Sequence, residues 1–318
     1  MDAAFQPATT STKVSLAGRD LLSMGDMTAP ELDFLLLLAA ELKSGQVDIQ
    51  THKTLGLLFN KASTRTRVSF SVAMYQMGGQ VIDLNPTVSQ VGRGEPLADT
   101  VRVLDRYLDI LAIRTFAHQD LEAAARYAQI PVINALTDEE HPCQILADLL
   151  TIQEAFETLE GITVTYLGDG NNIAHSLILG CALAGMNLRV ATPPSHAPDP
   201  VILAHGQRLA KPGTAITVTC DPVTAVQGAH VLYTDVWASM GQEAEAAGRL
   251  PLFQPFQLNE ALLAQADPEA IVLHCLPAHR GEEITEGVLE GPQARIWDQA
   301  ENRLHAQKAL LAAILGLV

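Results

Sequence analysis

Cysteine is scarce in this chain of 318 residues, and the four that occur lie far apart without any C-x-x-C pair. Such spacing argues against a disulfide framework and against a zinc knuckle. Positive charge is also in deficit, because 20 Lys and Arg face 36 Asp and Glu, for a formal net charge of -16. So acidic a chain repels phosphate backbones and anionic lipid. Neither nucleic acid nor a membrane is therefore an expected partner, and an anionic ligand would need a locally basic site.

Long apolar runs are missing as well. The stretch "LDFLLLLAAEL", from Leu32 to Leu42, is interrupted by acidic residues and is shorter than the roughly 18 residues that a membrane span requires, so it is typical of an amphipathic core helix. The start of the chain, "MDAAFQPATTSTK", lacks the basic segment followed by an apolar run that marks a secretory signal. These absences predict a cytoplasmic protein.

The sequence instead contains a succession of short apolar runs, each followed by a helix-like pattern. Three runs come first, at 54–59, 109–114 and 131–136. Five more follow, at 162–170, 187–193, 215–221, 229–235 and 270–277. This alternation predicts an α/β fold of two domains, each a parallel sheet covered by helices on both faces. The chain length suits two domains of about 150 residues.

One predicted helix marks the boundary between the domains. It begins at His141, in "HPCQILADLLTIQEAF", and lies between the two groups of strands. We interpret it as a bridge between a first domain at 1–140 and a second at 141–299. A last amphipathic helix, predicted at 300–318, is long enough to pack back on the first domain.

Ligands of open parallel sheets bind at the carboxyl ends of the strands, so residues just after each apolar run are candidates. The first run ends before "STRT", where Ser63, Thr64, Arg65 and Thr66 begin a predicted helix. Hydroxyls, guanidinium and free backbone N–H groups there favour an anion, although Ser or Thr at a helix start is often only a cap. Arg114 is the last residue of the second run, so its guanidinium is expected to reach the same crevice. An ordinary surface arginine is the alternative.

The later runs end in further polar residues. His141 and Gln144 share a helix start, where a capping role is the alternative. "GDGNN" resembles a dinucleotide fingerprint but has Ile173 at the third glycine position, and Asn172 supplies an amide. Asp235 can bind an ammonium group or simply form a turn.

Three further positions complete the candidates. Ser239 and Met240 share the loop of the preceding acid. Cys275 ends a strand, where a core cysteine is the alternative. Arg303 is predicted in the first turn of the last helix, where a cation opposes the helix dipole and so suggests a use other than stability. A zinc site is not expected, because the histidines and cysteines lack the spacing of a ligand motif: His141, Cys143, His274, Cys275 and His279.

Taken together, "STRT", "HPCQ", "DGNN", "DVWASMGQE", "HCLP" and "AENR" resemble the motifs of ornithine carbamoyltransferases in order and approximate spacing. The resemblance runs from about Leu16 to the C-terminus, and residues 1–13 match nothing. "SMG" and "HCLP" are similar to the ornithine branch rather than the aspartate branch. The resemblance implies transfer of a carbamoyl group from carbamoyl phosphate to the δ-amine of L-ornithine, giving L-citrulline and phosphate in arginine biosynthesis. It implies no cofactor and no metal.

The resemblance also implies roles for the candidates. Ser63, Thr64, Arg65 and Thr66 would hold the phosphate, and Arg114 would bridge the phosphate and carbonyl oxygens. The carbonyl would be polarised by His141. The carbamoyl NH2 would meet Gln144, the main chain at Cys275 and Leu276, and Arg303.

For ornithine, the resemblance implies Asn172, Ser239 and Met240 at the amino-acid end and Asp235 at the α-ammonium. Cys275 would lie near the δ-amine, without acting as a nucleophile. Gln90 matches a family residue that reaches the phosphate site of a neighbouring subunit, which implies a homotrimer with shared active sites.

Three alternatives remain open from the residues. A carbamoyltransferase for putrescine or an acylated ornithine is the nearest, and Asp235 with "SMG" counts against it. A nucleotide-binding oxidoreductase is disfavoured by the broken glycine fingerprint. A regulatory homologue without activity would be expected to have lost one of Arg65, Arg114, His141 or Asp235, and all four are present.

Overall fold

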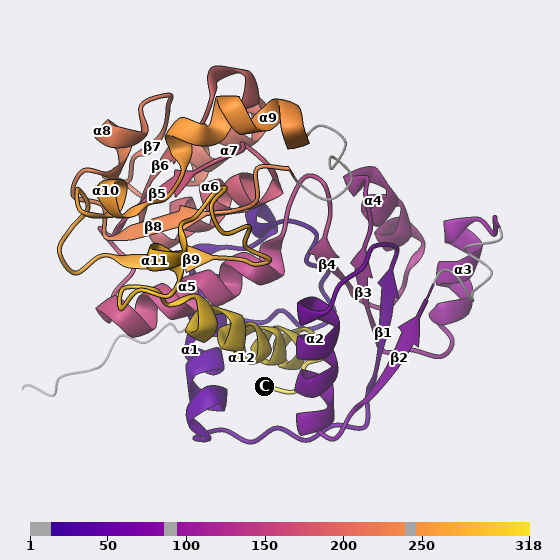
Figure 1. Ribbon diagram of the computed structural model, residues 1–318. Helices are drawn as coiled ribbons and strands as arrows, with labels where there is room; N and C mark the ends of the chain where they lie inside the picture. Colours follow the sequence, from indigo (N-terminus) through magenta and orange to yellow (C-terminus); the bar gives the residue numbers. More distant parts are fainter. Residues whose placement is uncertain (1–13, 86–93, 239–245) are drawn as a thin grey trace, which may run out of the picture.

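The computed structural model describes residues 14–85, 94–238 and 246–318, which form two parallel sheets (Figure 1). The first sheet has the order β2-β1-β3-β4 and the second the order β7-β6-β5-β8-β9. Every strand pair in both sheets is parallel, which confirms the predicted α/β class. The strands are β1 (Thr54–Phe59), β2 (Gln80–Leu84), β3 (Ile110–Arg114), β4 (Val132–Leu136), β5 (Thr163–Leu167), β6 (Asn187–Ala191), β7 (Ile216–Thr219), β8 (Val231–Thr234) and β9 (Ile271–His274).

The apolar runs of the sequence correspond to all of these strands except β2. This strand, "QVIDL", has only two adjacent apolar residues between Gln80 and Asp83, and its side chains are exposed or only partly buried. An edge strand pairs on one side only, so it does not need the continuous apolar run of an inner strand. The prediction therefore missed it.

Helices cover both sheets and fill the space between them (Figure 1). The α-helices are α1 (Ala29–Ser44), α2 (Arg65–Gln76), α3 (Leu97–Leu104), α4 (His118–Tyr127), α5 (Pro142–Phe156), α6 (Asn172–Ala184), α7 (Pro200–Leu209), α8 (Pro222–Val226), α9 (Ala246–Phe253), α10 (Glu260–Leu263), α11 (Glu286–Leu289) and α12 (Ile296–Ile314). Short 3-10 turns are η1 (Met24–Asp26), η4 (Pro194–His196) and η6 (Gln254–Phe256). Within these described ranges no helix combines the length and apolar character needed to cross a bilayer.

The C-terminal helix packs against α5, α1 and α2, and Figure 1 shows it lying between the last two. Its predicted start at residue 300 was wrong, because the helix begins at Ile296, whose side chain is fully buried. Arg303 consequently lies in the helix interior rather than in the first turn, so the argument from an opposed dipole no longer applies. Its burial, at 3 % exposure, is the feature that needs an explanation.

Strand register places the carboxyl ends of neighbouring strands side by side. Phe59 of β1 pairs with Arg114 of β3, which pairs in turn with Leu136 of β4. In the second sheet, Thr234 of β8 pairs with Leu167 of β5 and with His274 of β9. The loops that follow these strands therefore meet at the carboxyl edge of each sheet, where a parallel fold binds its ligands.

Candidate active site

A cavity of about 690 Å³ lies where the carboxyl-edge loops of the two sheets face each other. Every sequence-predicted site residue in the described part of the chain lines it. These are Ser63, Thr64, Arg65, Thr66, Arg114, His141, Gln144, Asn172, Asp235, Cys275, Leu276 and Arg303. Gln90, Ser239 and Met240 lie outside the described residues.

One wall of the cavity is the N-terminus of α2. Thr64 is the N-cap residue, and Arg65 and Thr66 form the first turn, where backbone N–H groups lack partners within the helix. Buried Thr66 accepts a hydrogen bond at Oγ1 from Nη2 of Arg303, 2.7 Å away. The free N–H groups, the positive end of the helix dipole and the hydroxyls together suit a phosphate-like anion.

Three arginines converge on this wall: Arg65 from α2, Arg114 from the end of β3 and Arg303 from α12. Burial and, after it, the charges of Arg303, Arg65 and Arg67 together lower the pKa of Arg114 to about 10. Arg114 still carries its charge at neutral pH. The wall is thus the locally basic exception that an otherwise acidic chain needs to bind an anion.

His141 faces this basic wall as an uncharged imidazole. It is the N-cap residue of α5, and its ring forms no hydrogen bond within the described residues. Burial, followed by the charges of Arg303, Arg114 and Arg65, holds the pKa of His141 well below its usual range. A neutral imidazole can donate an N–H to a carbonyl oxygen without adding another full charge to the wall.

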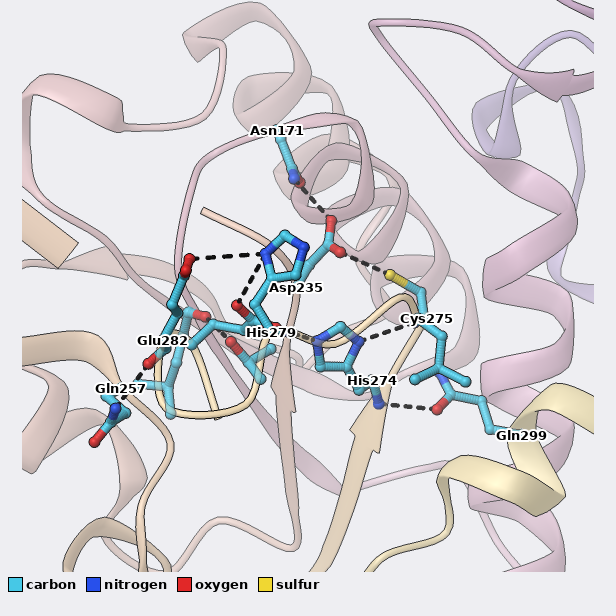
Figure 2. Close-up of polar contacts among 12 residues, drawn as sticks. Asn171, Asp235, Gln257, His274, Cys275, His279, Glu282 and Gln299 are labelled. Atoms are coloured by element: carbon cyan, nitrogen blue, oxygen red, sulfur yellow. Dashed lines mark hydrogen bonds and ion pairs between the residues drawn. The ribbon is translucent and has the colours of Figure 1, made fainter. Parts of the chain in front are cut away.

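The opposite wall carries the acid of the site (Figure 2). Asp235 follows β8 and is 6 % exposed. Its Oδ2 accepts from Nδ2 of Asn171 at 2.9 Å, and its Oδ1 accepts from Sγ of Cys275 at 2.9 Å. Burial and then the charge of Asp235 raise the pKa of Cys275 well above its usual range, so the sulfur is a thiol and not a thiolate nucleophile.

Asn171 was missed by the sequence prediction, which selected Asn172. The Oδ1 of Asn171 accepts from the backbone N–H groups of Ile173 and Ala174, so Asn171 caps α6 and its NH2 is aimed at Asp235. Asn172 instead donates from Nδ2 to the carbonyl of Thr137 at 2.7 Å, which ties the two sheets together across the cavity. The doubled asparagine after "GDG" was the available indication, since only one of the two can be the cap.

A strained turn after β9 joins the two walls. Leu276 has φ of 59°, a value that non-glycine residues rarely adopt, and the following bond to Pro277 is cis. The Leu276 N–H donates to Nδ1 of His274, and its carbonyl accepts from Nη2 of Arg65 at 2.6 Å. The N–H donated to Nδ1 places the His274 ring proton on Nε2, facing Glu283 at 3.1 Å.

Two clusters among the described residues bring metal-type ligand atoms within 4.8 Å of one another. In the first, Asp235, His274 and Cys275, both ring nitrogens of the histidine are already engaged (Figure 2). In the second, His279, Glu282 and Glu283, the last carboxylate is bonded to His274 and to the His279 backbone. In the first cluster these hydrogen bonds engage both ring nitrogens that a metal could use, so we assign no ion to it. In the second they engage only Oε1 of Glu283, whose Oε2 is buried without a hydrogen-bond partner among the described residues.

An ion pair at the rim joins Asp169, after β5, to Arg249 of α9, with Nη1 and Oδ2 2.7 Å apart. Arg249 also donates to the carbonyl of Trp237. The pair spans 80 residues of sequence and belongs to no local pattern. Sequence reasoning had no means of finding it.

A buried carboxylate, Glu140, lies directly behind His141. It accepts from Ser23 Oγ, from the Met24 N–H at 3.0 Å and from Ser176 Oγ at 3.1 Å, and that Ser176 oxygen accepts from the His141 N–H at 2.8 Å. Burial raises the pKa of Glu140 to about 7, although the three hydrogen bonds act in the other direction and Asp26 adds to the rise. The folded chain therefore binds a proton here that the unfolded chain releases near pH 4.5.

Glu140→Gln is expected to change how stability depends on pH. Between the unfolded and folded pKa values the parent loses stability as pH rises, which over this window amounts to about 2 to 3 kcal/mol. The glutamine cannot ionise, and its oxygen can still accept from Met24 and Ser176. The free energy of unfolding is measured with denaturant near pH 5 and near pH 8.5 for both proteins. The difference between variant and parent should shift in favour of the variant by about 2 to 3 kcal/mol from the lower to the higher pH. Exposed Glu122→Gln is the control, and parallel profiles for Glu140→Gln and the parent would contradict the expectation.

Comparisons with known protein families agree with this geometry. Residues 19–154 match the model of the aspartate/ornithine carbamoyltransferase carbamoyl-P binding domain, and residues 160–314 match that of the Asp/Orn binding domain of the same family. The two matches cover the cavity walls on both sides.

Individual relatives are similar over almost their whole length. The chain is 69 % identical to an ornithine carbamoyltransferase of Nostoc punctiforme over 302 residues, covering 95 % of this chain and 99 % of the relative. It is 66 % identical to that of Synechocystis over 304 residues, covering 96 % and 99 %.

Solved structures give the same picture. The crystal structure of ornithine carbamoyltransferase from Gloeobacter violaceus superposes with a TM-score of 0.87 at 58 % identity, covering 94 % of this chain and 99 % of that one. The enzyme from Pyrococcus furiosus superposes with a TM-score of 0.92 at 50 % identity, covering 96 % and 99 %.

Proposed function

This chain belongs to the aspartate/ornithine carbamoyltransferase family, and we propose that it transfers the carbamoyl group of carbamoyl phosphate to the δ-amine of L-ornithine. The products are L-citrulline and phosphate, as in arginine biosynthesis. One observation supports this most directly: a wall of three arginines and a neutral imidazole faces a wall that carries Asp235. The first suits an acyl phosphate and the second suits an ammonium group.

The chemistry follows from this placement. The neutral δ-amine attacks the carbonyl carbon, a new C–N bond forms, and the C–O bond to phosphate breaks. His141 donates to the carbonyl oxygen as it gains charge, and Arg65, Arg114 and Arg303 stabilise the departing phosphate. The amine gives up one proton, which the departing phosphate takes up. Because both substrates are held in one cavity, much of the rate gain comes from positioning.

The remaining roles belong to the same proposal. Ser63, Thr64 and Thr66 help to hold the phosphate, and Gln144 with the main chain at Cys275 and Leu276 holds the carbamoyl NH2. For ornithine, Asp235 binds the α-ammonium group, and Asn172, Ser239 and Met240 bind the amino-acid end. The sulfur of Cys275 lies near the δ-amine. Residues 1–140 and 141–299 are proposed as the two substrate-binding domains.

The oxidoreductase alternative is disfavoured at the turn after β5. Asn171 caps α6 with its side chain, and Asn172 is bonded to the carbonyl of Thr137. Two side chains thus occupy the helix start that a dinucleotide pyrophosphate would require as bare backbone. The third position of the fingerprint is Ile173, which is buried.

The acceptor is tested with a panel of amines. L-Ornithine is expected to give a higher kcat/KM than putrescine, N-acetylornithine or aspartate, because Asp235 and Asn172 would recognise a free α-amino acid, and aspartate has no second amine to be carbamoylated. The measurement is carbamoylated product formed from carbamoyl phosphate with each amine. A higher kcat/KM for any of these three amines would contradict the assignment of ornithine as the acceptor.

We also propose a homotrimer in which Gln90 of one subunit completes the phosphate site of the next. Exposed apolar side chains on α2 and on the edge strand β2 support such an assembly, since Val68, Tyr75 and Ile82 are 54 %, 60 % and 46 % exposed. A closed ring repeats one heterologous contact between successive subunits. The segment that contains Gln90 follows β2 directly.

Two defective chains should then repair each other. Gln90→Ala and Arg114→Ala homo-oligomers are each expected to be weak, whereas mixed oligomers contain some sites in which both residues are intact. Citrulline formation against mixing ratio, with subunit exchange confirmed by mass, should rise above either parent. A linear average despite exchange would show that each site is built from one chain.

A further inference from the structure

A second buried carboxylate, Asp148, lies behind the cavity without lining it. It is located on α5, one turn after Gln144, and its exposure is 0 %. The surrounding helix is apolar, and all of its residues from Pro142 to Ile152 are buried. A carboxylate in such a place is costly unless hydrogen bonds or charges compensate it, so its contacts indicate its use.

Two amides donate to one oxygen of this carboxylate. Oδ1 of Asp148 accepts from Nε2 of Gln144 at 2.8 Å and from Nε2 of Gln299 at 2.7 Å. The orientation of the Gln299 amide is set independently, because its Oε1 accepts from the backbone N–H of His274 at 2.9 Å (Figure 2). Its NH2 must therefore point at Asp148.

The orientation of the Gln144 amide is set by the chemistry on its two sides. Its Oε1 accepts from Nη1 of Arg303 at 2.9 Å, while its NH2 donates to Asp148. A guanidinium can only donate, and an ionised carboxylate can only accept. A flipped amide would place oxygen against oxygen and NH2 against guanidinium, so both contacts would become repulsive.

The carboxylate keeps its charge under working conditions. Burial raises the pKa of Asp148 to about 6, while Gln144, Gln299, the Tyr233 hydroxyl and the charge of Arg303 act in the other direction. At neutral pH the ionised form prevails, and it accepts from both amides. Gln144 consequently presents an acceptor to a cavity whose nearby side chains, Arg303 and His141 among them, are donors.

An acceptor at this point accommodates a ligand group that can donate a hydrogen bond. We propose that Asp148 is a positioning residue that fixes the Gln144 amide with its oxygen toward the ligand, so that the site selects a carbamoyl NH2 over a methyl group of similar size. The inference rests on the proposed function, which brings carbamoyl phosphate to this cavity. A site built to pair an N–H strongly rejects an analogue that lacks it, because a buried polar group is then left unpaired.

Two stable phosphonates test this selection. Phosphonoacetamide carries the NH2 of carbamoyl phosphate, and acetonylphosphonate has a methyl group in its place. Calorimetry on the full-length protein gives the two Kd values, and their ratio is the readout. The parent should favour the amide by well over about tenfold, and Asp148→Leu should lower that ratio by about tenfold or more.

Matched variants separate positioning from mere stability. Asp148→Asn should preserve the ratio, because Gln299 forces the asparagine oxygen toward both amides. In a Gln144→Leu background the ratio should already be small, and adding Asp148→Leu should change it no further. If Asp148→Leu does not fold, Asp148→Ser serves, since a hydroxyl can accept from Gln299 while donating to a flipped Gln144.

The possible failures are distinguishable. A folded Asp148→Leu or Asp148→Ser protein that keeps the parent's ratio of Kd values would overturn the inference. So would a result in which Asp148→Leu lowers this ratio as much in the Gln144→Leu background as in the parent. A parent that binds both phosphonates equally would also overturn it. A parent that binds neither would contradict the proposed function itself.

Discussion

Arg65→Ala is expected to lower kcat/KM for carbamoyl phosphate by about 100- to 1,000-fold, the scale of losing one preorganised oxyanion donor. Arg65 lies in the first turn of α2, beside Arg114 and Arg303, and it donates to the Leu276 carbonyl across the cavity. Its loss removes both a charge facing the phosphate and the tie that holds the turn after β9. Steady-state kinetics with varied carbamoyl phosphate measure the effect.

The control for Arg65 is Arg208→Ala, on the exposed side of α7 away from the cavity. It removes the same charge from the chain and should leave kcat/KM within about twofold, as surface substitutions usually do. Near-parental kinetics for Arg65→Ala would mean that "STRTR" is a capped, solvated turn rather than part of a phosphate site.

Asp235→Asn is expected to lower kcat/KM for ornithine by about 100-fold, while KM for carbamoyl phosphate changes little. The amide is isosteric, and its oxygen can still accept from Asn171, whose own NH2 is fixed by the cap of α6. What is lost is the negative charge that balances the α-ammonium group. Kinetics with each substrate varied in turn separate the two effects.

Exposed Asp33→Asn on α1 is the matched charge control and should behave like the parent. If the KM for carbamoyl phosphate rose as much as the KM for ornithine in Asp235→Asn, then Asp235 would not act specifically on ornithine. The acceptor assignment would then fail, although the phosphate site would stand.

Local patterns were sufficient to predict most of the fold. Inner strands such as β3, "ILAIR", are buried along their whole length and must be apolar throughout, so they are visible in the sequence. The edge strand β2 has no such requirement and was missed. The start of α12 was misplaced because "IWDQ", which precedes the predicted start, carries no strong start signal apart from Asp298.

The candidate site was predictable to the extent that it consists of residues at strand ends. Thr66 and Arg303 are 237 positions apart, yet both were found, because each belongs to a local motif. The Arg249 and Asp169 pair was not found, because Asp169 lies in "DGNN" but Arg249 belongs to no motif, and the two meet only through packing. Asp148 could have been noticed as an acid in an apolar helix one turn after Gln144, but its contact with Gln299 depends on how α12 crosses α5.

The most direct test of the central claim follows the atoms. The parent enzyme is incubated with carbon-13 carbamoyl phosphate and with ornithine labelled with nitrogen-15 at the δ-position. NMR should show citrulline in which the labelled carbon is bonded to the labelled nitrogen, formed in equal amount with phosphate. Phosphate release without carbamoylated product, or a carbamoylated product whose labelled carbon shows no coupling to the labelled δ-nitrogen, would contradict the account.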